Sequence, residues 1–385
     1  MNTKELDNTY VAGTYGRFDV AIKSGKGSTL VDEDGKEYID FGSGIAVNTF
    51  GASDDIWKQA IISQLDKIQH TSNLYYNENG AKLAQMLCEK TGMKKVFFSN
   101  SGAEANECAI KAARKYGTDK NPDKNIIITL ENSFHGRTIT TLSATGQDVF
   151  HKNFTPFTEG FVHVPANDIE KLNSTITENV AAIMIEIVQG EGGVNTLSPD
   201  YLSAIEKITT DNDILLVIDE VQTGNGRCGK LYSYMNFDIT PDIVSTAKGL
   251  AGGLPMGATL LGEKVENTLS KGTHGSTFGA NPVCCAAAIS NISRLTDEFL
   301  TEVTKKSKYI IETLSNTKGV KSVSGMGLML GIQTEKPASE IISKCIERGL
   351  LVLSAKEKVR LLPPLNITMD ELSKGLEILK GVIEE

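Results

Sequence analysis

Lys248 lies in the stretch STAKGLAGGLPMGA, residues 245–258, where four glycines and other small residues surround it. The stretch begins inside a strand-like apolar run, DIVSTA, so the lysine directly follows the end of that run. A lysine amine can attack a carbonyl group and form a Schiff base. Glycines, which lack a Cβ atom, leave space for another molecule to reach such an amine. The sequence therefore makes Lys248 a candidate for covalent chemistry with an aldehyde or ketone.

Two more groups of residues that could do chemistry follow strand-like runs. Asp219 is the last residue of the run ILLVID, and the polar stretch EVQTGNGRCG comes after it. Ser101 and Gly102 follow the run KVFFS and lead into a helical pattern. The first N–H groups of a helix have no partner within the helix, and they bind phosphate well. Taken alone, this helix start is more typical of an ordinary N-cap.

A third stretch, SFHGRT, places Phe134, His135 and Arg137 after the run NIIITL. Ligands of open α/β sheets bind beyond the carboxyl ends of the strands, where all of these groups are expected to meet. Pyridoxal phosphate (PLP) needs such a set: a lysine for its aldehyde, an acid at its pyridinium nitrogen, backbone amides for its phosphate and an aromatic face for its ring. The residues together therefore indicate PLP.

Short apolar runs alternate with helical patterns over most of the chain. The runs that we predict as buried strands are residues 95–99, 125–130, 181–187, 214–219, 242–247 and 256–262. Helical stretches include residues 53–70, with Ser53 as the N-cap, and a helix that ends at Gly117 as its C-cap. Strands that alternate with helices predict an α/β fold with a mainly parallel central sheet.

The pattern changes near residue 290, where amphipathic helices and short strands replace the buried runs. We expect residues 49–285 to form a large cofactor-binding domain and residues 286–385 a smaller α+β domain. The N-terminal segment, residues 1–48, contains the hairpin-like string STLVDEDGKEYIDF and is expected to join the smaller domain.

Composition excludes several classes of function. The chain has 385 residues, a net charge of −9 and no cluster of Lys and Arg, which argues against a nucleic-acid partner. The six cysteines lack the spacing of zinc ligands, so no metal site is expected. We find no signal peptide and no apolar stretch long enough for a membrane span, and we expect a cytoplasmic protein without a membrane partner.

One string could indicate a different cofactor. GNGRCG, residues 224–229, matches the glycine pattern of dinucleotide-binding sites and follows a strand-like run. Such a site also needs a helix that opens on the third glycine, and the following string KLYSYMNFDITPD has no clean helical stripe. A nicotinamide-dependent oxidoreductase therefore stays a weaker alternative.

Specific strings over essentially the whole chain occur in the order typical of one family. They are YGRFDVAIKSGKGSTLVDEDGKEYIDFGSGIAVNTFG, HTSNLYYNE, FFSNSGAEANE, SFHGRT, DEVQTGNGRCG, AKGLAGGLPMGA, HGSTFGANP and VRLLPPL. In these strings the sequence resembles the class III, fold type I, PLP-dependent aminotransferases. The resemblance implies a large domain with a mainly parallel sheet and a smaller α+β domain built from both ends of the chain.

The resemblance also implies how PLP is bound. Lys248 would carry the Schiff base and move a proton between the substrate and the cofactor, and Asp219 would pair with the pyridine nitrogen. The other cofactor-binding residues implied are Gly102 and Ala103 at the phosphate, Phe134 against the ring, Gln222 at the ring hydroxyl, Glu220 and Val221 beside it, and Thr277. Thr277 would reach the phosphate in the other subunit, so a homodimer with shared active sites is implied.

Substrate contacts follow from the same resemblance. Arg137 would bind a substrate carboxylate, with Ser276 nearby and Tyr15 as a further contact. Arg360 would take the α-carboxylate of glutamate, and Glu191 would mask this arginine when the amino donor enters. Within the family, the strings are most similar to those of members that act on N2-acetyl-L-ornithine. This implies ping-pong transfer of its δ-amino group to 2-oxoglutarate, which yields N-acetyl-L-glutamate 5-semialdehyde and L-glutamate in arginine biosynthesis.

Two alternatives remain within this framework. A sibling aminotransferase would act on ornithine, succinylornithine, succinyl-diaminopimelate or 4-aminobutyrate, and a comparison of these amines would separate them. A binding protein that keeps the fold without catalysis is disfavoured, because Lys248, Asp219 and Arg137 are all present.

Overall fold

The computed structural model describes residues 1–385 and is built around a seven-stranded sheet with the order β4-β12-β11-β10-β7-β5-β6. Its strands are β4 (Lys95–Ser99), β5 (Ile126–Leu130), β6 (Phe161–Val164), β7 (Val180–Ile185), β10 (Leu215–Asp219), β11 (Ile243–Thr246) and β12 (Gly257–Leu261). Strand β12 is antiparallel to both of its neighbours, and the pairs among β5, β6, β7, β10 and β11 are parallel. The predicted mainly parallel sheet is confirmed.

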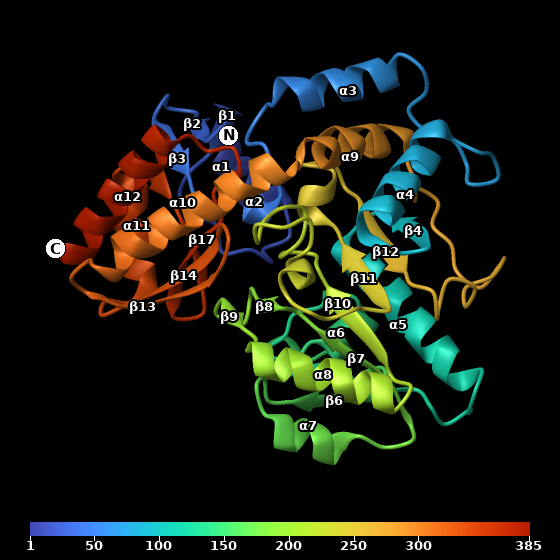
Figure 1. Cartoon of the computed structure of the whole chain (residues 1–385). Helices are drawn as coiled ribbons and strands as arrows, with labels where there is room; N and C mark the ends of the chain where they lie inside the picture. The colour runs from blue at the N-terminus through green and yellow to red at the C-terminus, as the bar shows by residue number, and fades with distance from the viewer.

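Helices cover both faces of this sheet, as Figure 1 shows. Helix α5 (Gly102–Thr118) lies on one face, where its alanines pack against alternate strand residues such as Met184 and Val217. The intervening residues, such as Ile183 and Ile218, face a larger core that includes residues of α8 (Pro199–Asp211). Because both faces are buried, the strands are continuous apolar runs, and the six predicted runs match observed strands to within about two residues.

Two predicted helix boundaries are wrong. Helix α3 spans Asp55–Leu65, and its N-cap is Asp54, whose carboxylate accepts a hydrogen bond from the backbone N–H of Trp57. Ser53 lies before the cap with a positive φ of 50°. Gly117 is not a C-cap, because α5 continues to Thr118. A Cβ atom at Gly117 would clash with the carbonyl oxygen of Lys124, so close packing explains this glycine.

The two ends of the chain form a second unit with two small sheets. One has the order β1-β2-β3-β15 and the other β13-β14-β17-β16. The strands are β1 (Ile22–Lys26), β2 (Thr29–Asp32), β3 (Glu37–Asp40), β13 (Val320–Met326), β14 (Met329–Thr334), β15 (Leu350–Leu351), β16 (Leu353–Ala355) and β17 (Lys358–Leu361). The pairing of β3 with β15 places the N-terminal segment beside the C-terminal one, and the blue and red elements of Figure 1 adjoin accordingly.

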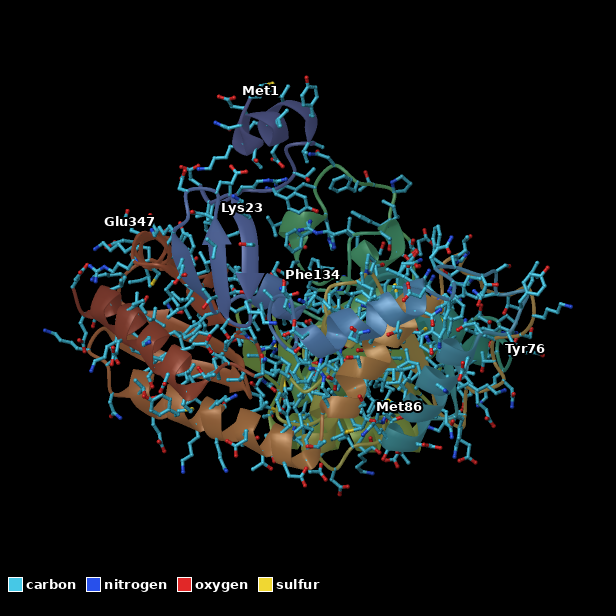
Figure 2. The ribbon with its side chains drawn as sticks, turned by 90° about the horizontal axis from the view of Figure 1, so that it is seen from above. Met1, Lys23, Tyr76, Met86, Phe134 and Glu347 are labelled. Carbon is cyan, nitrogen blue, oxygen red and sulfur yellow. The ribbon has the colours of Figure 1, made fainter.

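The remaining elements connect or cover these sheets. They are α1 (Thr3–Tyr10), α2 (Ser43–Ala46), α4 (Glu78–Thr91), α6 (Ile139–Ala144), α7 (Ile169–Thr175), α9 (Pro282–Arg294), α10 (Asp297–Ser315), α11 (Ala338–Glu347), α12 (Met369–Glu384), β8 (Val188–Gln189), β9 (Asn195–Thr196), η1 (Asp148–Phe150), η2 (Ser233–Asn236) and η3 (Lys248–Leu250). In Figure 2 the segment with Met1 projects away from the rest of the molecule. None of the helices has the length and apolar character that crossing a membrane requires.

The expected boundary between residues 285 and 286 falls inside α9. This helix packs along α3 and α4, which belong to the large unit. We therefore propose that the large unit extends through α9 and that the smaller unit starts with α10.

Candidate active site

A cavity of about 340 Å³ lies at the carboxyl ends of the central strands. Its lining includes ten of the residues singled out in the sequence: Ser101, Gly102, Ala103, Phe134, His135, Glu191, Asp219, Val221, Gln222 and Lys248. The strands that end here, β4, β10 and β11, are neighbours or near neighbours in the sheet, which is why residues far apart in sequence meet.

Lys248 follows β11 at the start of the 3-10 turn η3, with a positive φ of 43°. Burial lowers the pKa of its amine to about 8, against the opposing charges of Glu191 and Asp219 and with a smaller lowering contribution from Arg360. Near pH 7 the neutral form of the Lys248 amine is therefore more populated than the neutral form of a lysine exposed to water. A neutral amine is the form that reacts with a carbonyl group.

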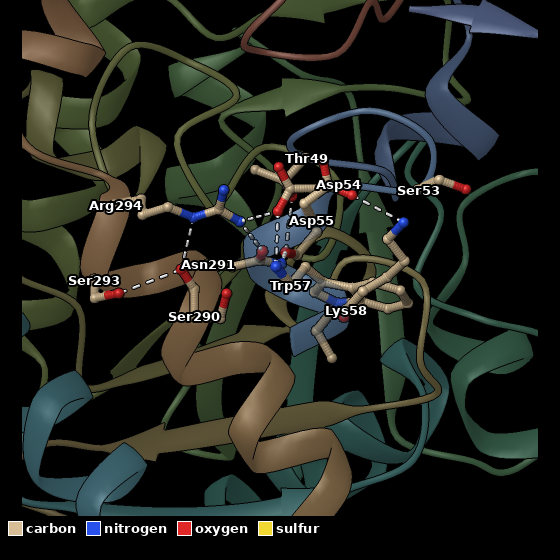
Figure 3. Close-up of polar contacts among 12 residues, drawn as sticks. Thr49, Ser53, Asp54, Asp55, Trp57, Lys58, Ser290, Asn291, Ser293 and Arg294 are labelled. Carbon is tan, nitrogen blue, oxygen red and sulfur yellow. Dashed lines mark hydrogen bonds and ion pairs between the residues drawn. The ribbon is translucent and has the colours of Figure 1, made fainter. Parts of the chain in front are cut away.

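The loop that carries Lys248 is held from outside the cavity by a polar cluster at the start of α3 and the end of α9 (Figure 3). The Thr49 hydroxyl and the Asn291 side chain both donate to the carbonyl of Gly249, at 2.8 and 3.2 Å. Trp57 donates from its indole nitrogen to the next loop carbonyl but one, that of Ala251, at 2.8 Å. These bonds satisfy carbonyls that no regular element would pair.

Arg294 ties the two halves of this cluster together. Its guanidinium forms an ion pair with Asp54 at 2.9 Å and stacks over the ring of Phe50 at 3.7 Å. The N-cap of α3 is therefore fixed to the last turn of α9, and the donors of the polar cluster keep their positions.

Asp219 ends β10 and is surrounded by donors. Its Oδ2 accepts from the Asn106 amide at 2.8 Å and lies 2.8 Å from Nδ1 of His135, and its Oδ1 accepts from the backbone N–H of Val221 at 2.9 Å. Burial would lower the pKa of His135, but the hydrogen bond and charge of Asp219 raise it overall. A protonated His135 would hold a negative charge on Asp219, which is what a partner for a pyridinium nitrogen requires.

The imidazole of His135 has only one of its two ring nitrogens in a hydrogen bond. Its Nδ1 is paired, whereas its Nε2 is buried without a partner. His70 likewise has a buried Nδ1 without a partner.

Glu186 lines the cavity and was missed in the sequence. Burial raises its pKa to about 8, with Asp219 adding to the effect and His135 opposing it. Its carboxylate accepts from the backbone N–H of Phe134 at 3.0 Å, so it helps to place that ring. Its position could have identified it, because Glu186 comes directly after β7, at the same edge of the sheet as the other cavity residues.

The start of helix α5 lies in the cavity lining, at the place where the sequence suggested a phosphate site. Ser101 is the N-cap and accepts from the backbone N–H of Glu104, and Gly102 and Ala103 are the first two helical residues. A Cβ atom at Gly102 would lie 2.7 Å from the side chain of Val221, so only glycine allows Val221 to pack over this helix start. The free N–H groups therefore remain accessible from the cavity.

Glu191 lines the cavity and forms an ion pair with Arg360, which is buried next to it but is not itself part of the lining. Nη1 of Arg360, on β17, lies 2.6 Å from Oε1 of Glu191, and the Gln222 side chain bridges the two. Burial would raise the pKa of Glu191, but the charge of Arg360 and its hydrogen bond lower it overall. The pair that the resemblance implied is therefore formed in the structure.

Six of the expected site residues do not line the cavity. Two of them, Arg360 and Glu220, are buried, and the other four are not. Arg137, Tyr15 and Thr277 are exposed. Ser276 is half-buried at the rim, where its hydroxyl oxygen accepts from the side chain of Asn100, which does line the cavity. These four residues lie on loops or on the N-terminal segment, and the strand-end argument does not place them.

Glu220 also points away from the cavity. Its carboxylate accepts from the hydroxyls of Thr223 and Ser233 and from the backbone N–H of Tyr234. Its side chain therefore supports the turn after β10, although its position in the sequence is next to Asp219.

The string GNGRCG lacks the geometry of a dinucleotide site. Residues 221–230 form turns, and the next helical element is η2, a 3-10 turn of four residues. Arg227, inside the string, is buried and donates to the carbonyls of Leu328 and Pro363 in the smaller unit. A Cβ atom at Gly226 would clash with Leu365 and one at Gly229 with Thr304, so these two glycines allow close contact between the two units.

Comparisons with known proteins agree with this geometry. The chain matches the family model described as aminotransferase class-III over residues 10–383. It is 51% identical to the acetylornithine aminotransferase of Haemophilus ducreyi, over 99% of this chain and 98% of that protein. An N-acetylornithine aminotransferase structure from Stenotrophomonas maltophilia superposes with a TM-score of 0.85 at 34% identity, covering 98% of both chains.

A second solved structure is similar over nearly the whole chain. The ornithine aminotransferase of Toxoplasma gondii, crystallized with oxidized glutathione and showing partial occupancy of PLP at its active site, gives a TM-score of 0.94. It is 30% identical, and the match covers 99% of this chain and 93% of that one. The fold is therefore that of the fold type I PLP-dependent transferases, as predicted. With its family model matched from residue 10 to residue 383, this chain belongs to the class III aminotransferases.

Proposed function

We propose that the cavity binds PLP through Lys248, Asp219, the start of α5 and Phe134. The fit rests on a buried lysine with a lowered pKa, a carboxylate fixed by three donors and a glycine at the helix start where a Cβ would clash. When bound, PLP supplies an aldehyde for amine exchange and a ring that accepts electrons from the substrate carbon.

The residues of this chain then have separate tasks. Nζ of Lys248 acts as the base that takes a proton from the carbon bearing the substrate amine and returns it during the exchange. Asp219 keeps a negative charge at the ring nitrogen, with His135 and Asn106 holding its Oδ2. Glu186 and Val221 complete the walls around the ring.

We further propose that the reaction is transfer of the δ-amino group of N2-acetyl-L-ornithine to 2-oxoglutarate. The observation that carries this proposal is the ion pair of Arg360 with Glu191, whose side chain lines the same cavity as Lys248. An aminotransferase that accepts a terminal amine in one half-reaction and an α-amino acid in the other needs an arginine that is free only in the second. The names of similar proteins support the acetylated substrate.

A homodimer is part of the proposal. Leu74, Tyr75 and Tyr76 are exposed apolar residues in one loop, and Phe278 is exposed in another. The Asn73 side chain donates to two backbone carbonyls of residues 276–279, so the two loops adjoin. Figure 2 shows Tyr76 at the edge of the molecule. Clustered exposed aromatic side chains are typical of protein interfaces, and a second copy here would bring Thr277 toward the other cavity.

The test combines a spectrum with a substrate comparison. The purified protein should be yellow, and its visible band should vanish in Lys248→Ala but not in the control Lys230→Ala, which changes an exposed lysine. With 2-oxoglutarate as acceptor, kcat/KM should be higher for N-acetylornithine than for ornithine, succinylornithine, succinyl-diaminopimelate or 4-aminobutyrate. A colourless protein that takes up no PLP would refute the cofactor, and a preference for 4-aminobutyrate would refute the substrate.

A further inference from the structure

The two arginines of the proposed substrate site are held in different ways. Arg360 is paired with the carboxylate of Glu191, whereas the guanidinium of Arg137 lies over aromatic rings. Its central carbon is 4.0 Å from the ring centroid of Phe150 and 5.4 Å from that of Phe134. Arg137 forms no ion pair with any carboxylate of the chain.

The ring of Phe150 is fixed on two sides. It meets the ring of Phe134 edge-on, with centroids 5.7 Å apart and planes at 79°. The next residue, His151, is tied through Nε2 to the carbonyl of Leu142 on α6 at 2.9 Å. Helix α6 itself begins just after Arg137, so the arginine and the turn that carries Phe150 flank the same short helix.

A ring and a carboxylate restrain an arginine with different consequences. A carboxylate neutralises the guanidinium, and an incoming substrate carboxylate has to displace it. The face of an aromatic ring attracts the cation through its quadrupole and leaves the N–H donors at the edge of the guanidinium free. Arg137 is therefore held in one orientation while its charge and its N–H donors stay available to a substrate. The charge and donors of Arg360 are instead occupied by Glu191.

This difference matches the chemistry of the proposed substrates. N-acetylornithine and 2-oxoglutarate each have a carboxylate distant from the reacting carbon, so one arginine is needed in both half-reactions. Only the 2-oxo acid and its product have a second carboxylate beside the reacting carbon. An arginine that serves both half-reactions has to be always available, and one that serves a single half-reaction has to be masked in the other.

We propose that Phe150 is a positioning residue of the substrate site, whose ring holds Arg137 ready for the distal carboxylate that both substrates share. This inference rests on the proposed function, since it assigns the carboxylate to Arg137. Phe134 contributes a second, more distant ring, but its main place is the cavity wall.

The test uses Phe150→Leu in the holoenzyme, with Phe150→Tyr as the conservative variant and Phe154→Leu as the control. Phe154 is an exposed ring in the same loop and undergoes the same change. In Phe150→Leu we expect the KM values of N-acetylornithine and of 2-oxoglutarate to rise together by about two- to fivefold, the range that the loss of an exposed cation–π contact implies. We expect kcat to stay within about twofold, and Phe150→Tyr to restore both KM values.

Two readouts separate positioning from a general loss of structure. The half-reaction with n-butylamine, a donor without a carboxylate, should have the same rate constant in Phe150→Leu as in wild type. The Kd of glutarate, measured by calorimetry, should rise by the same factor as the two KM values. An equal loss with n-butylamine, or an unchanged Kd for glutarate, would overturn the inference.

Failure of the proposed function gives a different pattern. If the wild-type enzyme did not use N-acetylornithine, the ratio of glutarate Kd values between Phe150→Leu and wild type would still report on the role of the ring. If Phe150→Leu did not fold, which its melting temperature would show, Phe150→Met would take its place in the same measurements.

Discussion

Replacement of Glu191 by alanine should shift the enzyme toward its α-amino acid partner. Arg360 is only 4% exposed, and its Nη1 contacts Oε1 of Glu191 at 2.6 Å while Nη2 lies 3.4 Å from the other carboxylate oxygen. Without the carboxylate, Gln222 remains the only partner of this guanidinium, at 3.1 Å. The α-carboxylate of 2-oxoglutarate or glutamate would then bind without displacing an acid.

The magnitude follows from the bonds that are removed. Hydrogen bonds to charged groups contribute about 1.5–3 kcal/mol, and the 30% exposure of the Glu191 side chain places this pair at the lower end. A change of about 1.4 kcal/mol corresponds to roughly tenfold in an equilibrium constant. We therefore expect kcat/KM for 2-oxoglutarate and for glutamate to rise about tenfold. For N-acetylornithine we expect a fall of similar size, because the unmasked cation of Arg360 faces a substrate end that has no carboxylate.

The assay measures each half-reaction separately by stopped-flow absorbance, so that the donor and acceptor constants are independent. Glu191→Gln should fall between wild type and Glu191→Ala, because a neutral amide accepts a weaker hydrogen bond than a carboxylate. Glu178→Gln, at an exposed position, is the matched control and should behave as wild type. Donor and acceptor constants that change by the same factor in Glu191→Ala would refute the masking role.

Three further predictions concern Lys248 and the packing that supports it. Burial lowers the pKa of Lys248 to about 8. The rate of PLP uptake by the cofactor-free protein should therefore fall about tenfold per pH unit below pH 8 and level off above it. A stopped-flow pH series with a midpoint near pH 10 would contradict this. Thr49→Val removes a buried hydrogen bond to the loop after Lys248. It should lower the free energy of unfolding by about 1 kcal/mol in urea titrations of the cofactor-free protein, and an unchanged value would show that the bond does not stabilise the loop. Gly117→Ala brings a methyl group against the carbonyl of Lys124 and should cost about 1–3 kcal/mol in the same assay, whereas Gly13→Ala, in open space, should cost little.

Six of the seven strands of the central sheet were predictable because each is an apolar run, whereas β6, with the sequence FVHV, is only partly buried and was not predicted. Helix ends were less predictable than strands. Ser53 and Asp54 are both good N-cap residues, and only the backbone conformation shows which of them caps α3. Gly117 shows the same limit: glycine at a helix end is typical of a C-cap, but here it allows the helix to pack closely against Lys124 and Ala181 outside it.

The candidate site divides in the same way. Asp219 ends a strand, and Lys248 and Gly102 come shortly after the ends of theirs, so the topology of an α/β sheet brings the three together whatever the intervening loops do. Glu191 and Arg360 are 169 residues apart and come from different units, so no local pattern predicts their contact, which only the family resemblance implied. Phe150 was missed because its role depends on how a loop ring lies against Arg137.

The origin of these residues has a consequence for how the two half-reactions are coupled. Asp219 ends β10, and Lys248 follows the adjacent parallel strand β11 at the start of η3, so both positions belong to the larger unit and are tied to the same sheet. Arg360 stands on β17 of the smaller unit and Glu191 on a loop of the larger one, so their ion pair crosses between the two units. Any rotation of the smaller unit would therefore change the masking of Arg360 and leave the distance between Lys248 and Asp219 unchanged. Choice of substrate and chemistry at the ring are in this way mechanically separable, which is what a single cavity needs when it has to serve two unlike substrates in turn.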